Sequence, residues 1–588
     1  MRSILAFCSL AALAAPAVAQ NPRANVDLDP GPLSAGSGRS VSTDGVFAAQ
    51  LFKDFATDGI YIVSSADSGL TWSAPVQIDL TAGSKFMQDD SVHVIGGTAY
   101  CGWSVTSPGG ASGEDDFAYT EVDITGALPV VTLPEILVAP SALGLAGGQI
   151  RSYEFEVCAG AAGRNAVFVA NFDPTAASMS DEIWVTAAPL GGPFIPPFPL
   201  SVLPTDADEF ALACDGDDVV VVWNDNSAGL DDSYLTYNPT GGAGGAWTAP
   251  IMANALTTDD MNGLDVDVKF GTALVGFLNQ IGNTGGDEPT ARLFALGAVP
   301  APLSPELPVT TLVGGGFDSD EIAVRISAAA NLVAMWDYST AGDEIYTSTS
   351  TTAGASWIPD VKVSSTTGGF IVMDEGRDGV VVGAWTGGSS PNSAESAYSC
   401  DDGLTWTTVP DTNTLGGDVD FAVITYDERK RNVITGHNTD AVAPPANDAV
   451  AGGYAVCVPA VSTPRVDGFG PCNPSSLTVG PVALGGSLDV SVDLTTTGHS
   501  TAVIFGFDTP LAGIKLGGGQ VLLCIDSGSG ELLSGGGKAA AGPLAMFSCP
   551  VPNDPCLLGF TVCIQAIHAF GVSPFALSNA YDVTVGSM

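Results

Sequence analysis

The feature that most constrains the fold is a unit of about 50 residues that recurs from residue 20 to about residue 460. In each unit a short strand beginning in acidic or polar residues leads through a tight turn into a second strand, which ends in an aromatic residue or in His437. The turns carry Gly and Asp, as in "TDG" (43–45) and "DGDD" (215–218), which suit tight hairpins. Because helical periodicity is almost absent, we expect an all-β chain. The units start near residues 39, 86, 151, 208, 258, 317, 368 and 415.

A second regularity joins the third and fourth strands of several units, the pattern Ser-x-Asp-x-Gly-x-x-Trp. It is intact in "SADSGLTW" (65–72) and "SCDDGLTW" (399–406) and altered in "STTAGASW" (350–357) and "TGGAGGAW" (240–247). We expect the hydroxyl and the carboxylate to cap turn amides, Gly to take the left-handed conformation and Trp to cover the neighbouring strand. The residues assigned to this structural role are Ser65, Asp67, Gly69, Trp72, Ser399, Asp401, Gly403, Trp406, Ser350, Gly354 and Trp357.

Four antiparallel strands per unit, repeated around an axis, predict a β-propeller. Counting units gives eight blades, with seven as the alternative because unit boundaries slip easily. The eighth unit lacks a clear fourth strand, whereas "ANVDLD" (24–29) is similar to the fourth strand "PVQIDL" of the first unit. We therefore expect the N-terminal segment to complete the last blade and remove an exposed sheet edge.

From about Arg465 the pattern changes to alternating strands between Gly-rich turns, without the propeller aromatics, which predicts a small β-sandwich. It resembles the C-terminal modules of large secreted bacterial proteins. The expected domains are a signal peptide over residues 1–19, a propeller over 20–464 and the sandwich over 465–588.

The N-terminus indicates export. Arg2, the apolar run from Ile4 to Ala15 and the small residues before Gln20 are typical of a secretory signal peptide, so a secreted, cell-surface or periplasmic protein is expected. Eleven cysteines, one of them inside that peptide, leave an even number, which fits an oxidising compartment. Cys158 and Cys214 occupy matching points of neighbouring units, so a bridge between them is conceivable. No other apolar run approaches the ~20 residues that span a bilayer.

The chain is strongly acidic, with 64 acidic against 18 basic residues and a net charge of −46. This charge makes nucleic acid, anionic membranes and acidic polymers poor partners and favours cations. The simpler explanation is solubility in a salty exterior.

Acidic residues recur at the starts of the first strands, which converge on one mouth in a propeller. Converging carboxylates repel one another, and bound cations, raised pKa values or distance through solvent relieve the repulsion. We hypothesise that this mouth binds Ca²⁺ or a cationic or polyhydroxyl ligand; the alternative is an acidic rim in a protein that is acidic everywhere. The predicted binding residues are Asp89, Asp90, Glu154, Asp206, Asp208, Asp259, Asp260, Asp318, Asp320, Asp418 and Asp420.

The first unit, "STDGVFAAQL" followed by "DGIYIVSSADSGLTWSAPVQI", resembles the first blade of sialidase-superfamily propellers, whose Asp-boxes have the Ser-x-Asp-x-Gly-x-x-Trp form. The resemblance covers roughly residues 25 to 460 and implies that the boxes lie at the periphery, away from a catalytic mouth. It also implies an arginine triad, for which Arg39, Arg151 and Arg325 fall on first strands. The family's Phe/Tyr-Arg-Ile-Pro motif is absent, and the ordinary interpretation is that each of these arginines pairs with a carboxylate.

The sequence therefore predicts a secreted, non-catalytic propeller that binds a glycan or a cell-surface component, with Ca²⁺ as a possible ligand. An acidic mouth does not favour anionic sialic acid. Two alternatives stay open, an exo-acting sialidase-like glycoside hydrolase that uses the acidic mouth and a structural envelope protein. The aromatics that end the second strands are expected in the core between blades.

Overall fold

The computed structural model describes residues 25–28, 40–54, 57–88, 91–106, 115–138, 149–161, 163–173, 181–201, 206–226, 231–255, 260–280, 286–311, 318–339, 343–388, 391–409, 411–429, 431–443, 446–457, 461–465, 473–483, 486–507, 514–516, 520–524, 533–540, 542–551, 561–571 and 575–586. The predicted signal peptide lies outside these residues. The chain divides into two compact units, residues 21–454 and a second unit that contains 455–588. All the secondary-structure elements assigned to the described residues are β-strands, as the sequence predicts.

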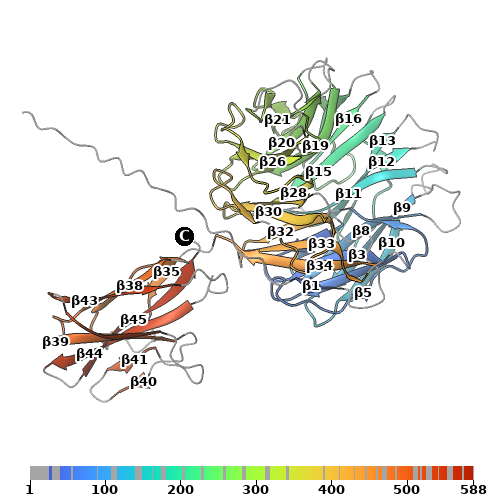
Figure 1. Ribbon diagram of the computed structural model, residues 1–588. Helices are drawn as coiled ribbons and strands as arrows, with labels where there is room; N and C mark the ends of the chain where they lie inside the picture. Colours follow the sequence, from blue (N-terminus) through green and yellow to red (C-terminus); the bar gives the residue numbers. More distant parts are fainter. Residues whose placement is uncertain are drawn as a thin grey trace, which may run out of the picture. The chain divides into compact units, whose positions relative to one another are not determined.

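The first unit is a propeller-like array of antiparallel sheets of four or five strands (Figure 1). Four of these sheets come from the first half of the unit. In spatial order they are β2 (Ser40–Thr43), β3 (Ala48–Asp54), β4 (Gly59–Ser65) and β5 (Val76–Gln77); β10 (Val130–Val138), β9 (Asp115–Asp123) and β8 (Thr98–Thr106), with β6 (Lys85–Phe86) and β7 (Val92–Ile95) both on β8; β11 (Gln149–Gly160), β12 (Gly163–Asp173), β13 (Glu182–Pro189) and β14 (Phe198–Pro199); and β15 (Ala207–Asp215), β16 (Asp218–Asp225), β17 (Asp232–Asn238) and β18 (Ile251–Met252).

The second half of the unit forms the other sheets. They are β19 (Asp260–Lys269), β20 (Thr272–Gln280), β21 (Asp287–Ala295) and β22 (Ala301–Pro302), with β23 (Leu307–Pro308) also on β21; β24 (Ile322–Ile326), β25 (Leu332–Tyr338), β26 (Glu344–Ser350) and β27 (Val361–Lys362); β28 (Gly368–Glu375), β29 (Val381–Gly387), β30 (Ser393–Ser399) and β31 (Thr407–Val409); and β32 (Val419–Asp427), β33 (Asn432–Ala443), β34 (Ala446–Ala455) and β1 (Val26–Asp27).

The first strands of these sheets contact one another in chain order, from β2 through β7, β11, β15, β19, β24 and β28 to β32, and β32 contacts β2 again. The N-terminal strand β1 pairs antiparallel with β34, where Val26 lies opposite Ala451. The prediction that the N-terminal segment completes the last sheet is therefore confirmed.

The Ser-x-Asp-x-Gly-x-x-Trp turns have the expected hydrogen bonds. The Oγ atom of Ser65 accepts the Gly69 N–H at 2.8 Å, and the carboxylate of Asp67 accepts the Thr71 N–H at 2.8 Å. Gly69 has φ 82°. Trp72 packs beside Ile434 of the last sheet.

The turns at 399–406 and 350–357 repeat this arrangement. Ser399 Oγ accepts the Gly403 N–H at 2.9 Å, and Ser350 Oγ accepts the Gly354 N–H at 3.0 Å. Both glycines are left-handed, with φ 85° and 80°. Asp401 caps the second turn as Asp67 caps the first, and Trp406 and Trp357 pack against the neighbouring hydrophobic cores.

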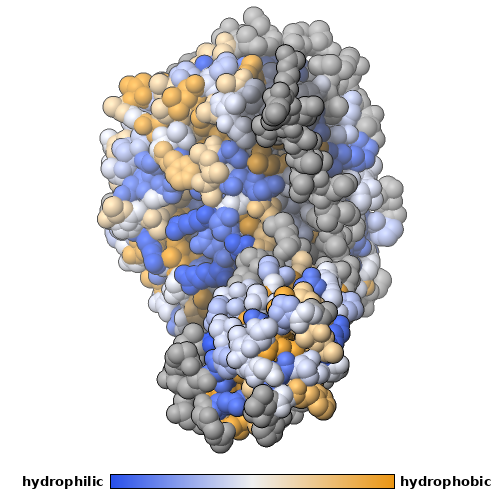
Figure 2. Space-filling model, turned by 90° about the vertical axis from the view of Figure 1, so that its left-hand side faces the viewer, coloured by the Kyte–Doolittle hydropathy of each residue, from blue (hydrophilic) through white to orange (hydrophobic). Residues whose placement is uncertain are grey.

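The aromatics that end the second strands lie in the core. Trp103, Trp336 and Trp385 are 0 % exposed and Trp223 is 2 % exposed. Large exposed apolar side chains are scattered, and the face in Figure 2 mixes hydrophilic and hydrophobic residues.

The second unit contains two main sheets that share one hydrophobic core. The larger sheet consists of β35 (Val461–Pro464), β45 (Phe575–Gly586), β44 (Thr561–Gly571), β39 (His499–Phe507) and β42 (Leu533–Ala539), with β37 (Val482–Ala483) parallel to β45. The smaller sheet consists of β36 (Leu477–Val479), β38 (Ser487–Asp493) and β43 (Leu544–Pro550), and a separate pair consists of β40 (Ile514–Lys515) and β41 (Val521–Leu522).

Disulfides occur in both units. Cys158 on β11 forms a disulfide with Cys214 on β15, which is the pairing that their matching positions in the sequence suggest. Cys524 forms a disulfide with Cys563. Cys400 and Cys457 are also disulfide-bonded. These bonds fit the expected oxidising compartment. The described part of the chain contains no helix with the length and apolarity to cross a membrane.

Candidate functional site

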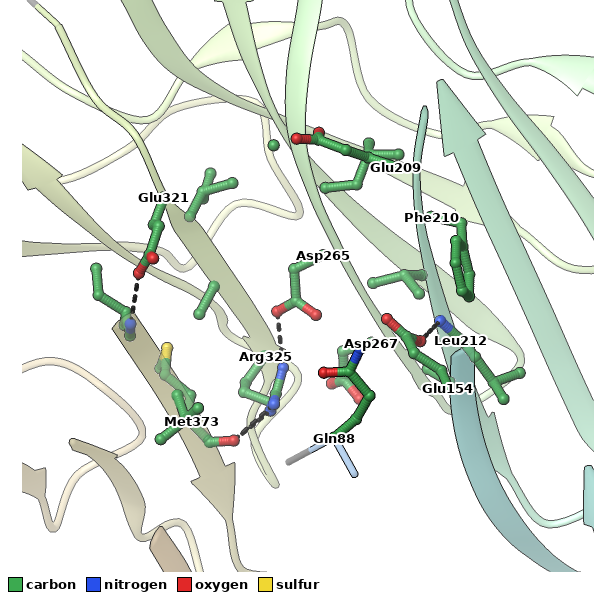
Figure 3. A pocket seen from close by; sticks show the side chains of 18 of the residues that line it. Gln88, Glu154, Glu209, Phe210, Leu212, Asp265, Asp267, Glu321, Arg325 and Met373 are labelled. Carbon is green, nitrogen blue, oxygen red and sulfur yellow. Dashed lines mark hydrogen bonds and ion pairs between the residues drawn. The ribbon is translucent and has the colours of Figure 1, made fainter. Parts of the chain in front are cut away.

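The first strands of five consecutive sheets enclose a cavity of about 840 Å³ (Figure 3). The lining comes mainly from β11, β15, β19, β24 and β28. Arg325 is the one cation among the described lining residues, and it stands among carboxylates. Those carboxylates are Glu154, Glu156, Glu209, Asp265, Asp267, Asp320, Glu321, Asp374 and Glu375. The cavity therefore suits neutral or positively charged ligands.

β-Bulges shape the mouth of this cavity, at the end where the first strands begin. The register shifts between Ile150 and Ser152 in β11, Ala207 and Phe210 in β15, Asn262 and Leu264 in β19, and Gly369 and Val372 in β28. A bulge bends the strand and re-aims the side chain of the extra residue. Sequence spacing alone does not show where a bulge falls, so these side chains could not be placed in advance.

Two of the bulges bring Glu209 and Phe370 to the cavity. Glu209 is exposed. Phe370 has φ 58°, a conformation that side chains other than Gly rarely adopt, and it is 53 % exposed. Such a backbone costs of order 1 kcal/mol or more and is found at functional sites. The fold thus holds an aromatic ring at the mouth against a conformational cost.

Deeper in the cavity the carboxylates bond to the backbone of the next sheet. The N–H groups of Leu212 and Val324 donate to Glu154 and Asp265, the second at 2.7 Å. The Tyr426 N–H donates to Asp374 at 2.7 Å. A first strand is the inner edge of its sheet, so half of its backbone N–H groups lack a sheet partner. These acids supply the missing acceptors and join neighbouring sheets.

The same arrangement continues on either side. Asp267 accepts the Ile326 N–H at 2.5 Å, and Glu321 accepts the Ile371 N–H at 2.6 Å, which fixes the chain next to Phe370. The sequence carried a signal for these residues. Acids two apart alternate with apolar residues in "EFE" (154–156) and "DVD" (265–267), which places both acids of a pair on one side of the strand.

Arg325 balances part of the negative charge at depth. Its guanidinium contacts Asp265 at 2.9 Å and Glu375 at 3.5 Å, and it donates to the Met373 carbonyl. Lys269 contacts Glu375 at 3.0 Å. Burial alone would lower the pKa of Arg325, but the neighbouring carboxylates raise it, so the residue stays charged.

The carboxyl groups around Arg325 bind protons more readily than usual. Burial, followed by the nearby Glu375 carboxylate, raises the pKa of Asp267 well above its ordinary range. The same two causes raise the pKa of Asp374. At the mouth, burial and the neighbouring Asp318 raise the pKa of Asp320.

Only some of the binding residues predicted from the sequence line the large cavity. Glu154 and Asp320 line the cavity. Asp206, Asp318, Asp418 and Asp420 are described but do not line it. Asp418 instead accepts the Asn392 N–H at 2.6 Å. Outside the described residues or side chains lie Asp89, Asp90, Asp208, Asp259 and Asp260.

The proposed arginine triad is not assembled by the described residues. Arg325 lies deep in the large cavity, whereas Arg151 lines a different cavity and contacts Asp173 at 2.9 Å. Arg39 lies outside the described residues. Both described arginines pair with carboxylates, as expected for arginines in so acidic a chain.

The sequence also predicts Ca²⁺ as a ligand of these carboxylates. Within the described part of the chain, no group of three or more His, Cys, Asp or Glu side chains is placed to hold a metal ion. The carboxylates of the cavity instead accept hydrogen bonds from backbone N–H groups and form ion pairs with Arg325.

Comparisons with known proteins give structural matches only. No protein-family model and no curated protein matches the sequence. A sialidase from Trypanosoma rangeli in complex with sialic acid matches with 9 % identity and a TM-score of 0.31, covering 75 % of this chain and 89 % of that one. The polysaccharide lyase Uly1 matches with 6 % identity and a TM-score of 0.41, covering 74 % of this chain and 99 % of that one. A protein of unknown function from Dyadobacter fermentans matches with 14 % identity and a TM-score of 0.34, covering 52 % of this chain and 98 % of that one. At these identities and scores the matches carry no argument about ligand or activity.

Proposed function

We propose that this protein is an exported, eight-bladed propeller that binds a neutral or basic carbohydrate at the mouth of its large cavity and does not cleave it. The observation that carries the proposal is Phe370, an aromatic ring held half-exposed at the mouth by a bulge with positive φ. An aromatic face stacks on the apolar face of a sugar ring, and carboxylates such as Glu209 and Asp320 accept hydrogen bonds from its hydroxyl groups.

The acids deep in the cavity favour binding without cleavage. Glu154, Asp265 and Asp374 already accept backbone N–H groups of neighbouring first strands. A carboxylate committed to such a bond is poorly placed to exchange a proton with a substrate. The ring of contacts among first strands supports the count of eight blades.

For the rest of the chain we propose the order of domains given by the sequence, a signal peptide over 1–19, then the propeller and then a β-sandwich, with the boundary between the last two a few residues before the expected Arg465. The shared core of the two main sheets supports the sandwich. The strand β35 pairs with β45, so the first residues of the second unit precede Arg465. The disulfides support an extracellular location.

The experiment is a glycan array that contains neutral, amino-sugar and acidic glycans, followed by calorimetry on the best ligand. Phe370→Ala should weaken binding at least tenfold. The chain offers a matched control in Phe270, which has φ 55° and is 59 % exposed but sits at the hairpin turn at the other end of β19. Phe270→Ala should leave the affinity unchanged. Equal losses in both variants, or no neutral or basic ligand on the array, would overturn the proposal.

A second candidate, an exo-acting glycoside hydrolase, rests on Asp320 and Glu209. Burial and the neighbouring Asp318 raise the pKa of Asp320, and a carboxyl group with a raised pKa can serve as the acid in glycoside hydrolysis, with Glu209 as the candidate second carboxylate of the mouth. A screen of fluorogenic glycosides, sialosides included, tests it. Sugar release that is lost in both Asp320→Asn and Glu209→Gln would establish the enzyme and refute a purely binding role.

A further inference from the structure

A second cavity, of about 320 Å³, has the opposite electrostatic character. It lies where β3 and β8 end and where β6 and β11 begin, which is also the mouth end of the first strands. Its described lining contains three cations and no carboxylate. The lining residues are Lys53, Ser84, Lys85, Phe86, Ser104, Thr106, Ile150 and Arg151. Three of only 18 basic residues in the chain meet here.

The counter-ions of these cations stand outside the cavity lining. Lys53 contacts Asp58 at 2.7 Å, and Lys85 contacts Asp79 at 2.9 Å. The lysine side chains are 9 % and 3 % exposed. Each lysine is thus neutralised by a carboxylate, and its ammonium also donates to backbone carbonyls, Lys53 to that of Lys85 at 2.7 Å and Lys85 to those of Asp58 at 3.1 Å and Gly83 at 3.3 Å.

Arg151 supplies the free donors. Its position at the bulge between Ile150 and Ser152 re-aims its side chain, which is 41 % exposed. One Nη atom donates to Asp173, and the other guanidinium N–H groups make no hydrogen bond with the described residues. A guanidinium can therefore present a two-pronged face to a ligand oxyanion.

Three hydroxyl groups and an aromatic ring complete the cavity. In the described part of the chain, the side chains of Ser84, Ser104 and Thr106 have no hydrogen-bond partner, although all three line the cavity. Phe86 is 50 % exposed, and its carbonyl accepts the Tyr153 hydroxyl at 3.2 Å, which fixes the backbone beneath the ring.

We infer that this cavity binds the anionic group, a carboxylate or a sulfate, of an acidic sugar whose ring packs on Phe86. Arg151 and the hydroxyls donate to the anion, in a lining whose described residues include no carboxylate that would repel it. This inference is independent of the ligand proposed for the large cavity.

The overall charge of −46 does not prevent such binding at physiological salt. The Debye length is about 8 Å at 0.15 M ionic strength, so distant acids are largely screened while contacts inside the cavity are not. The net charge affects how fast an anionic ligand approaches the protein, whereas the lining of the cavity determines how tightly the ligand binds.

The test is calorimetry at 0.15 M NaCl with three tetrasaccharides: unsulfated chondroitin, chondroitin 6-sulfate and the neutral cellotetraose. In the Phe370→Ala variant, in which neutral ligands of the large cavity bind weakly, at least one anionic tetrasaccharide should bind at least tenfold more tightly than cellotetraose. Binding of unsulfated chondroitin identifies a carboxylate as sufficient, and binding of the sulfated form alone identifies a sulfate. Equal affinity for all three would overturn the inference.

Variants locate the site. Arg151→Ala should weaken anionic binding at least tenfold, and Arg151→Lys should restore only part of it because the two-pronged contact is lost. Arg164→Ala, which changes an exposed arginine at the hairpin turn of the same sheet, should have no effect.

Thr106→Val, which keeps the shape and removes one donor, should weaken binding severalfold, and it replaces Arg151→Ala as the test if that variant does not fold. Phe370→Ala should not change anionic binding, so the result is separable from the function of the large cavity. An unchanged affinity in both Arg151→Ala and Thr106→Val would refute the site.

Discussion

The mouth and the interior of the large cavity differ in what their carboxylates do, although the same strands supply both. In the interior, Glu154, Asp265 and Asp374 accept backbone N–H groups from the adjacent first strand. At the mouth, Asp320 is exposed, and its carboxylate accepts no hydrogen bond from the described residues. An acid on a channel-lining strand is therefore not by itself a sign of a ligand site, because the inner edges of the sheets need acceptors first.

The largest expected effect is on the interior cation. Arg325→Ala removes the positive charge from a group of buried carboxylates and should lower the free energy of unfolding by about 3 kcal/mol. Chemical denaturation measures it. Lys362→Ala, which breaks an exposed pair with Glu344, should cost about 0 to 1 kcal/mol. If the two variants were equally stable, the interior charges would not hold the sheets together.

The next effect separates an interior acid from a mouth acid. Asp265→Ala leaves the Val324 N–H without an acceptor and should cost about 2 kcal/mol. Asp320→Ala should change stability by less than about 0.5 kcal/mol, because no described donor depends on its carboxylate. Thermal unfolding of both variants gives the comparison, and a larger loss for Asp320→Ala would reverse it.

A smaller effect should appear in the pH dependence. The folded-state pKa of Asp267 is raised, so its contribution to stability is fully present below its unfolded pKa and is lost as pH rises through the folded pKa. Between pH 5 and 8 the wild type should lose on the order of 1 kcal/mol more than Asp267→Asn. Denaturation midpoints across this range measure the difference. Glu344→Gln is the control, because the bonds to Lys362 and Tyr346 lower the pKa of Glu344 and its titration falls below this range. Parallel curves for wild type and Asp267→Asn would contradict the raised pKa.

The smallest expected effect on stability has the opposite sign. Phe370→Gly relieves a positive φ and should raise the free energy of unfolding by up to about 1 kcal/mol while weakening carbohydrate binding. Phe270→Gly relieves a nearly equal φ and should bring a similar gain with no loss of binding. If Phe370→Gly kept full affinity, the strained ring would have no part in recognition.

The repeat in the sequence was enough to predict the fold in some detail. Its periodicity gave the four-strand units, and the match between "ANVDLD" and "PVQIDL" gave the pairing of β1 with β34. Cys158 and Cys214 were placed by their equivalent positions in two units. Each of these features depends on local strand order, which a repeat preserves.

The sites were predicted less well because they depend on departures from the repeat. A bulge adds one residue and changes which side chain faces the cavity, and this is how Glu209 and Phe370 were missed. The basic cavity combines Lys53, Phe86 and Arg151 from three sheets. Lys53 and Phe86 carry no signal in the sequence, and Arg151 was singled out only as a candidate for the arginine triad. Net charge, summed over the chain, does not show where the described lining of a cavity holds cations and no carboxylate.

The pairing of the N-terminal strand with the last sheet also constrains how the protein acquires its structure. Asn25 donates to Thr414, 389 residues further along the chain, and β1 then pairs beyond it with β34. Synthesis delivers β1 first and its partner almost last, so the final sheet forms only after nearly the whole first unit has emerged. Contacts so distant in sequence make closure slow. The first unit therefore acquires its full set of sheets only at the end of chain synthesis or after it.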